Sequence, residues 1–199
     1  MIRIGFLTYL IVLAACIASA QSMPDLRKEL LQMRDRDQAV RETCTNGTAD
    51  EQIKCLMKAK DEIDTPNTKR LNDIFIAHGF PTASLVGPDG VQAFALLMQH
   101  SGDIELKKRS EKGMQRALRD KVIAVMDYAN FVDRLLTDQG KLQIYGSNFV
   151  TQGGKFVMSP VEDPKNLDKR RKKIGLPPID EYAKKLGEIY KLEVVIPKP

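Results

Sequence analysis

The sequence predicts a mainly α-helical fold: a single helical domain of about six helices, with a small β-hairpin and a short helical C-terminal tail. Three observations support this class. Apolar residues recur at helical spacing over most of residues 25–138. After Gly140 the apolar spacing changes to two, as in strands, and the charged tail is divided by "GLPP". One domain of this length can bury a proper core.

The N-terminus has the features of a secretory signal peptide. Arg3 precedes an uncharged run over residues 4–15, and the small residues "ASA" precede Gln21. The run is too short to span a bilayer as a helix. We therefore expect residues 1–20 to be a signal and residues 21–199 to form the domain. The segment "LAAC" also matches a bacterial lipoprotein box, in which Cys16 would carry a lipid anchor. Both alternatives predict export, to a periplasmic or extracellular location.

The charge balance favours no nucleic-acid partner. Without residues 1–20 the net charge is about +4, which is mild for a domain of this size. The densest basic runs, at residues 107–109 and 169–173, are typical of solvated helix faces. Since exported proteins meet little nucleic acid, we expect a small polar ligand or an anionic envelope polymer as partner. Membrane contact is expected only through a lipid on Cys16.

The helices are predicted from periodicity and from their start and stop residues. Their expected ranges are about 25–43, 50–63, 68–78, 91–100, 103–118 and 121–138. The segment "TASLVGPDG" is expected to be a loop. The fourth range contains "AFALLM", which is apolar on nearly every side, so this helix should be the buried central one.

The remaining two cysteines are expected to form a disulfide. Cys44 and Cys55 are the one possible pair in an oxidising compartment, whichever N-terminus the protein has. The bridge would pin the end of the first helix to the start of the second. A short loop of this kind contributes roughly 2 to 3 kcal/mol.

The C-terminal third is predicted to begin with a hairpin. The segments "LQIYGSNFV" and "KFVMSPV" flank a glycine turn, "TQGG". Gly146 interrupts the first segment, which indicates close approach by another part of the backbone. Two short helices separated by "GLPP" should follow.

An acidic residue interrupts the apolar stripe of the first helix. The stripe is formed by Leu26, Leu30, Met33 and Val40, and Asp37 occupies the missing position between the last two. A buried charge is costly unless it is paired, hydrogen-bonded or protonated. Asp37 is therefore a candidate site residue.

The sixth helix repeats this pattern. Its stripe is formed by Val122, Met126, Ala129 and Leu136, and Asp133 fills the gap before Leu136. Asp127 and Arg134 fall on the opposite, solvent-facing side. We expect Asp133 to turn inward and to meet the same polar site as Asp37.

Several residues could partner these carboxylates. Arg41 lies four residues after Asp37 on the same side of its helix. His100 ends the buried fourth helix, where the helix dipole favours its protonated form. Neutral donors and acceptors are available on Gln99, Gln143, Tyr145 and Asn148.

These same residues carry a family resemblance over nearly all of residues 21–199. The elements are "DQAVR" (Asp37, Gln38, Arg41), "LLMQH" (Gln99, His100), "VDRLL" (Asp133, Arg134) and "QIYGSN" (Gln143 to Asn148). In these motifs the chain resembles an uncharacterised, largely bacterial family known as a domain of unknown function, with a Gln-x-Tyr-Gly-Thr-Gln signature. The segment "VEDPKNLDKRRKKIGLPPIDEY" is similar to the C-terminal pattern of that family. The resemblance implies no activity, because the family has none assigned.

The chain departs from the family pattern at two places. Ser147 and Asn148 stand where the signature has Thr-Gln, which keeps a hydroxyl and an amide but shortens the reach of the amide. Cys44 and Cys55, with the segment between them, look like an addition of this member or its close relatives.

Three classes of function fit these residues. In an enzyme, His100 would share proton transfer with Asp37 or Asp133, and Gln143 and Tyr145 would orient the substrate of a hydrolytic or transfer reaction. A binding protein would hold a small polar ligand in the same pocket. In a structural or interaction module the polar cluster would only fix helix packing. No cofactor motif, reactive cysteine or phosphate loop is present, and His100 with carboxylates has no recognisable metal-ligand spacing.

Overall fold

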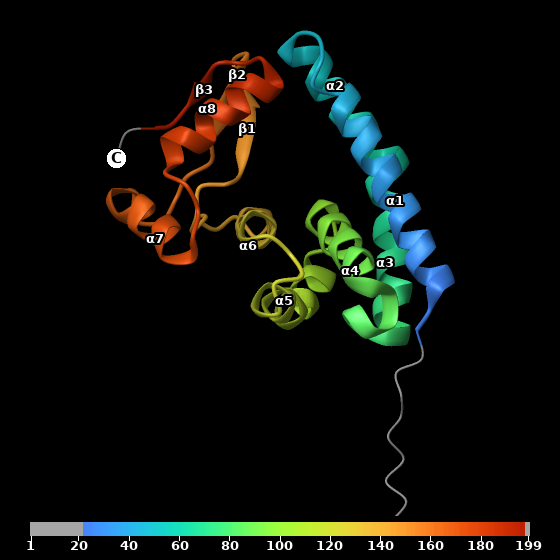
Figure 1. The fold of residues 1–199 in the computed structure, drawn as a ribbon. Coiled ribbons are helices and arrows are strands. Elements are labelled where there is room, and N and C mark those ends of the chain that lie inside the picture. Colours follow the sequence, from blue (N-terminus) through green and yellow to red (C-terminus); the bar gives the residue numbers. More distant parts are fainter. Residues whose placement is uncertain (1–21, 198–199) are drawn as a thin grey trace, which may run out of the picture.

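The computed structural model describes residues 22–197 and confirms the mainly α-helical fold (Figure 1). The helices are α1 (Pro24–Thr43), α2 (Ala49–Ala59), the π-helical turn η1 (Lys60–Asp64), α3 (Thr65–His78), α4 (Ala83–His100), α5 (Ile104–Arg119), α6 (Val125–Asp138), the 3-10 turn η2 (Pro164–Asn166), α7 (Leu167–Ile174) and α8 (Ile179–Tyr190). The strands are β1 (Phe149–Gln152), β2 (Lys155–Met158) and β3 (Val194–Val195). The two predicted helices of the tail are present as α7 and α8.

Helix α4 is the centre of the larger hydrophobic cluster, as its composition predicted. Phe94, Leu97 and Met98 are fully buried, and the helix packs against α1, α3, α5 and α6. Phe94 also meets Phe80 edge-to-face, with ring centroids 5.1 Å apart. The last turn of α4, with its two polar residues, therefore starts from a fixed position in the core.

Helix α4 begins earlier than expected. The prediction of a loop over residues 82–90 is wrong, because this segment forms helical turns with one break at Gly87, where φ is 72°. Pro88 suits the first turn of the helical segment after the break, because its fixed φ is helical and its missing N–H is not needed there. Asp89 beside it pairs with Arg27 of α1 at 2.6 Å.

Helices α2 and α3 are joined through η1 into one continuous helical rod. The buried residues of α2 are Gln52 and Ala59, and those of α3 are Leu71 and Ile74. The wider π-helical turn makes the inward-facing stripe step by five residues, from Ala59 to Asp64, before it continues along α3. The expected break between residues 63 and 68 is therefore wrong, and Asp64 is turned inward.

A second hydrophobic cluster is built from the sheet, α7 and α8. Strands β1 and β2 form the predicted antiparallel hairpin, with Phe149 opposite Met158. The short strand β3, which the periodicity did not predict, pairs parallel to β2. In Figure 1 this part lies on the side of α6 away from α1 and α4.

The segment before β1 is not a strand, which corrects the prediction for residues 142–148. It forms a single bridge between Gln143 and Val161 and then turns at Gly146, where φ is 67°. A Cβ atom at Gly146 would lie 3.1 Å from Met158 Sδ and 3.2 Å from Ile179 Cδ1. Gly146 is therefore a point of close approach to the second cluster.

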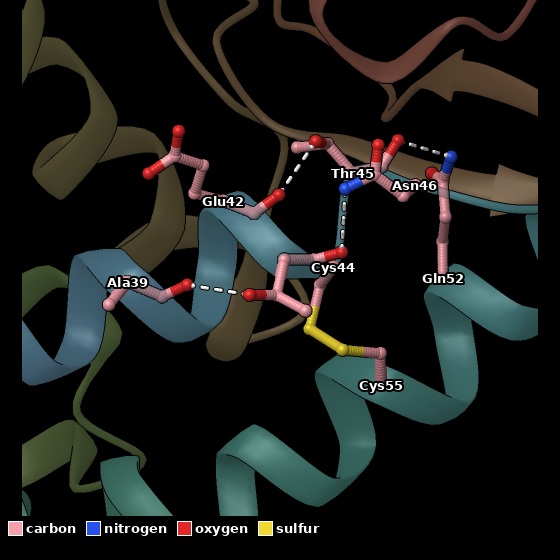
Figure 2. Close-up of a disulfide and its surroundings, with 8 residues drawn as sticks. Ala39, Glu42, Cys44, Thr45, Asn46, Gln52 and Cys55 are labelled. Atoms are coloured by element: carbon pink, nitrogen blue, oxygen red, sulfur yellow. Dashed lines mark hydrogen bonds between the residues drawn. A yellow bond between two sulfur atoms is a disulfide. The ribbon is translucent and has the colours of Figure 1, made fainter.

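The predicted disulfide is present between Cys44 and Cys55 (Figure 2). It ties the residue after α1 to the middle of α2, and Thr48 caps the start of α2 in a capping box with Glu51. The buried side chain of Gln52 donates to the carbonyl oxygens of Thr45, at 3.1 Å, and of Tyr190, at 2.9 Å. Helix α2 therefore links the end of α1 to the end of α8.

The expected signal peptide and Cys16 lie outside the described residues. None of the helices in residues 22–197 combines the length and the apolar content needed to cross a membrane. The disulfide is consistent with folding in an oxidising compartment.

Candidate functional site

Asp37 is the centre of a buried polar cluster formed by α1, η1 and the end of α4. Its side chain is 1% exposed. The Asp37 carboxylate lies 3.0 Å from His100 Nδ1, 3.2 Å from Arg41 Nε and 2.7 Å from Gln38 Nε2. The structure thus brings three of the predicted site residues, Asp37, Arg41 and His100, into direct contact.

Arg41 links Asp37 to a second carboxylate. Its Nη2 atom donates to Asp64 Oδ1 at 2.6 Å, while its Nε donates to Asp37. Asp64 was not among the predicted site residues. It stands seven residues before Leu71 and ten before Ile74, on the apolar stripe of α3, so extending that helix N-terminally would have indicated it.

The contacts around Asp37 favour one tautomer of His100. Arg41 Nε–H lies between two acceptor positions, the Asp37 carboxylate at 3.2 Å and His100 Nδ1 at 3.1 Å. If Nδ1 were unprotonated, its lone pair would face the Asp37 oxygen at 3.0 Å without a hydrogen between them. We assign the proton to Nδ1, because this gives the 3.0 Å contact with Asp37 a hydrogen and directs Arg41 Nε–H to the carboxylate, and the assignment leaves a lone pair on Nε2.

The buried environment shifts the pKa of both His100 and Asp37. Burial lowers the pKa of His100 and outweighs the hydrogen bond to Asp37, which acts in the opposite direction. Burial would raise the pKa of Asp37, but the hydrogen bond and charge of His100 and the charge of Arg41 outweigh it, so the pKa is lowered. The pair that follows at neutral pH is an ionised Asp37 and an uncharged His100.

Asp37, Asp64 and His100 also have ligand atoms within 4.8 Å of one another, which is close enough to share a metal ion. The guanidinium of Arg41 already lies against both carboxylates and supplies their positive charge. A metal ion would have to displace it. Arg41 therefore fills the role that a cation would have in this cluster.

Beside His100 a cleft of about 160 Å³ opens between the helical part and the sheet. It is lined by Gln99, His100, Asn130, Arg134, Ser147, Asn148, Phe149, Phe156, Tyr182, Leu186 and Tyr190. His100 Nε2 lies 3.4 Å from the Gln99 amide nitrogen. This is a long, weak contact that a bound water or hydroxyl could replace.

Helix α6 contributes two polar residues to this cleft. Asn130 and Arg134 are four residues apart and share one face of the helix. The sequence stripe had placed Arg134 on the solvent side, and the side chain is indeed exposed, but the sheet faces it there. The aromatic wall opposite, Phe149, Phe156, Tyr182 and Tyr190, could not be assigned to the site without the fold.

Asp133 is buried on α6 but lies in a different set of contacts from Asp37. Its two carboxylate oxygens accept the backbone N–H groups of Ile144, Tyr145 and Ser147 at 2.8 to 3.2 Å. The Ser147 hydroxyl adds a further hydrogen bond at 2.8 Å. Asp133 thus holds the loop that leads into β1, and His100 is not among these partners.

Gln143 and Tyr145 belong to the same loop. The fully buried amide of Gln143 bonds the backbone of Asn148 in both directions and donates to Ser159. Tyr145 uses its backbone to contact Asp133 and to accept from Arg171 at 2.6 Å. Neither side chain lines the cleft. Asn148 does, and its amide is held by Thr137 at 2.7 Å.

The fold and the site together define a mainly helical protein in which a buried Asp–His pair borders a small cleft beside a three-stranded sheet. The chain belongs to a family of unknown function, DUF6624, whose family model matches residues 24–195. This match confirms membership of a family without an assigned function. No curated protein matches the chain significantly, and no solved structure does.

Proposed function

We propose that the protein is an exported enzyme of hydrolase-like activity, which binds a small polar ligand in the cleft and uses His100 as a general base. The observation that carries this proposal is the Asp37–His100 contact of 3.0 Å at the edge of the cleft. The disulfide supports export, because such bonds persist in oxidising compartments. The signal-like N-terminus supports it too.

The chemistry proposed for His100 follows from its tautomer. With the Nδ1 proton donated to Asp37, the Nε2 lone pair accepts a proton from a water molecule or from a hydroxyl of the ligand. The imidazolium formed is stabilised by the Asp37 carboxylate, as in other carboxylate–histidine pairs. A lowered pKa keeps the imidazole unprotonated, and so ready to accept a proton, at neutral pH.

The other predicted site residues take different roles in this proposal. Arg41 positions Asp37 and balances its charge. Gln99, Asn130 and Asn148 offer amides to the ligand within the cleft. Asp133, Gln143 and Tyr145 act indirectly, because they hold the loop that carries Ser147 and Asn148 to the cleft.

The alternative is a non-catalytic structural or interaction module. The complete pairing of Arg41 with Asp37 and Asp64 favours it, because such a network can fix how α1, η1 and α4 meet without any chemistry. In that case His100 would serve only helix packing.

The two alternatives differ in what His100→Gln does. We expect this variant to keep its melting temperature within a few degrees and to lose at least a hundredfold in kcat/KM against any small ester, amide or glycoside that the wild-type protein hydrolyses. Screening the wild-type chain and the variant against one panel of such substrates makes the comparison. A large drop in melting temperature with no hydrolysis by the wild type would favour the structural module.

A further inference from the structure

The cleft contains one positive charge that the fold itself does not use. Resting on the proposed ligand-binding function, we infer that the ligand is a small carboxylate that also carries a hydroxyl or amide hydrogen, and that Arg134 binds its carboxylate group. The inference concerns the class of ligand, and it stands separately from the role of His100 as a base.

Arg134 is the residue that faces the cleft with a free charge. The ion pairs within residues 22–197 engage the neighbouring cations Arg41 and Lys107, with Asp64 and Asp138, but do not include Arg134. None of the described residues that line the cleft is acidic. A bound anion therefore meets an unpaired guanidinium in the lining, and the carboxylate behind His100, Asp37, is already balanced by Arg41.

A single guanidinium favours a carboxylate over a phosphate. Arg presents a planar pair of donors that matches the two oxygens of a carboxylate. His100, the other basic residue in the lining, is kept uncharged at neutral pH by its lowered pKa. A phosphate dianion is usually met by several cations or by a row of backbone N–H groups. The lining residues include one permanent cation, and the backbone N–H groups of Ser147 and Asn148 are already donated to Asp133 and Gln143.

Gln99 favours a ligand that carries a hydrogen-bond donor. Its Oε1 atom is buried and has no hydrogen-bond partner, while its Nε2 atom faces His100. An unsatisfied buried acceptor costs about 1 to 3 kcal/mol, which a ligand hydroxyl or N–H would recover. A donor group on the ligand would therefore add to the binding energy that its charge supplies.

The volume of the cleft and its aromatic wall limit the size and shape of the ligand beyond its polar groups. At about 160 Å³ the cleft is smaller than the ~300 Å³ at which pockets for drug-sized ligands begin. The ring centroid of Phe156 lies 5.4 Å from that of Phe149, on which it stacks, and 4.9 Å from that of Tyr190. Together the three rings form a rigid apolar surface. Hydroxy acids, sugar acids of one ring and N-acylated amino acids have the required size and combination of groups.

Matched pairs of acid and amide test the inference directly. The probes are D-glucuronate with D-glucuronamide, N-acetylalanine with N-acetylalaninamide, and lactate with lactamide. Each is titrated into the isotope-labelled protein while the NMR signals of the side-chain amides of Gln99 and Asn148 are followed. We expect at least one acid to bind ten to a hundred times more tightly than its amide, as for a charge-assisted hydrogen bond.

The variants assign that preference to Arg134. Arg134→Gln should abolish the difference between acid and amide, and Arg134→Lys should keep part of it. Arg119→Gln is the control for charge, because Arg119 is exposed at the end of α5 and outside the cleft. It should change acid binding by less than threefold.

The outcomes separate the two proposals. If no acid binds more tightly than its amide, or if inorganic phosphate binds more tightly than every acid, the carboxylate assignment is overturned. The assignment is also overturned if Arg134→Gln and Arg119→Gln have the same effect on acid binding. His100→Gln should keep the preference for each acid over its amide, whatever its effect on overall affinity, since the anion is held by Arg134. The role of His100 as a base is then judged by hydrolysis alone.

Discussion

At the scale of single residues, the contact with Asp37 is the reason to assign the proton of His100 to Nδ1. Arg41, Gln38 and His100 all direct hydrogens at one carboxylate that is almost fully buried. Since every donor in this set already has an acceptor, no rearrangement is needed to hold the imidazole in one orientation. Asp37 is therefore the residue on which the others depend.

Asp37→Asn removes a negative charge and one of the two carboxylate oxygens that three donors share. Asp37→Asn should lower the free energy of unfolding by about 3 kcal/mol. The reason is that the largely buried guanidinium of Arg41 would lose one of its two carboxylate partners and keep only Asp64. Chemical denaturation measures this. Asp35→Asn, an exposed carboxylate on the same helix, should cost less than about 0.5 kcal/mol. Equal stability of the two variants would contradict the central position of Asp37.

The lowered pKa of His100 predicts a pH dependence of stability. Between the lower folded pKa and the usual value of 6.5, the unfolded state binds more protons than the folded state. Stability should therefore fall as the pH drops from 6.5 to 5, by at most about 2 kcal/mol from this one group. The lowered pKa of Asp37 acts only at lower pH, below about 3.8.

Removing the imidazole isolates this contribution. Melting curves at pH 7.5 and pH 5 should show a smaller loss of stability for His100→Gln than for the wild-type protein. A loss of the same size in both proteins would mean that the pKa of His100 is not lowered by folding.

At the scale of elements, the loop between α6 and β1 joins the two hydrophobic clusters. Asp133 gathers three backbone N–H groups of this loop, and Gly146 lies against the second cluster. The loop in turn presents Ser147 and Asn148 to the cleft. Its shape is therefore part of the site, although most of its side chains face elsewhere.

Gly146→Ala tests how closely the loop at Gly146 approaches the second hydrophobic cluster. The variant suffers both the positive φ of 67° and the contacts of a new Cβ with Met158 and Ile179. Gly153→Ala, in the hairpin turn, has a φ of 57° and open space around it, so it suffers the backbone penalty of about 1 kcal/mol alone. We expect the loss of unfolding free energy to be clearly larger for Gly146→Ala. A smaller loss than for Gly153→Ala would contradict the packing described.

The sequence predicted most helices, because apolar spacing and capping residues are local signals. It predicted that Asp37 turns inward for the same reason, since an acid interrupted a regular stripe. It could not predict that Asp133 binds a loop, because a stripe gives the direction of a side chain and not its partner. Asp64 was missed because it fell in the expected break between residues 63 and 68, which the π-helical turn in fact bridges. Residues 142–148 were assigned to a strand because their side-chain alternation resembles one.

At the scale of the whole molecule, two contacts bring the helical part and the sheet together. The loop held by Asp133 is one. The other is Gln52 of α2, which reaches the end of α8 while the disulfide ties α2 to α1. The cleft beside His100 lies between the parts joined in this way.

The disulfide should therefore stabilise more than its own loop. The double variant Cys44→Ser, Cys55→Ser is expected to lose roughly 2 to 3 kcal/mol of unfolding free energy. Hydrogen exchange should also become faster at the end of α8, because the contact of Gln52 with Tyr190 depends on α2. An unchanged exchange rate there would show that α2 does not depend on the bridge for its position.

In the proposed mechanism Asp37 holds an uncharged His100 with its Nε2 lone pair directed to the cleft. The most direct test is the NMR spectrum of the imidazole nitrogens of His100 across a pH titration. We predict an Nδ1–H tautomer at pH 7 and a pKa below 6.5. A proton on Nε2, or an imidazolium ion at pH 7, would contradict the account.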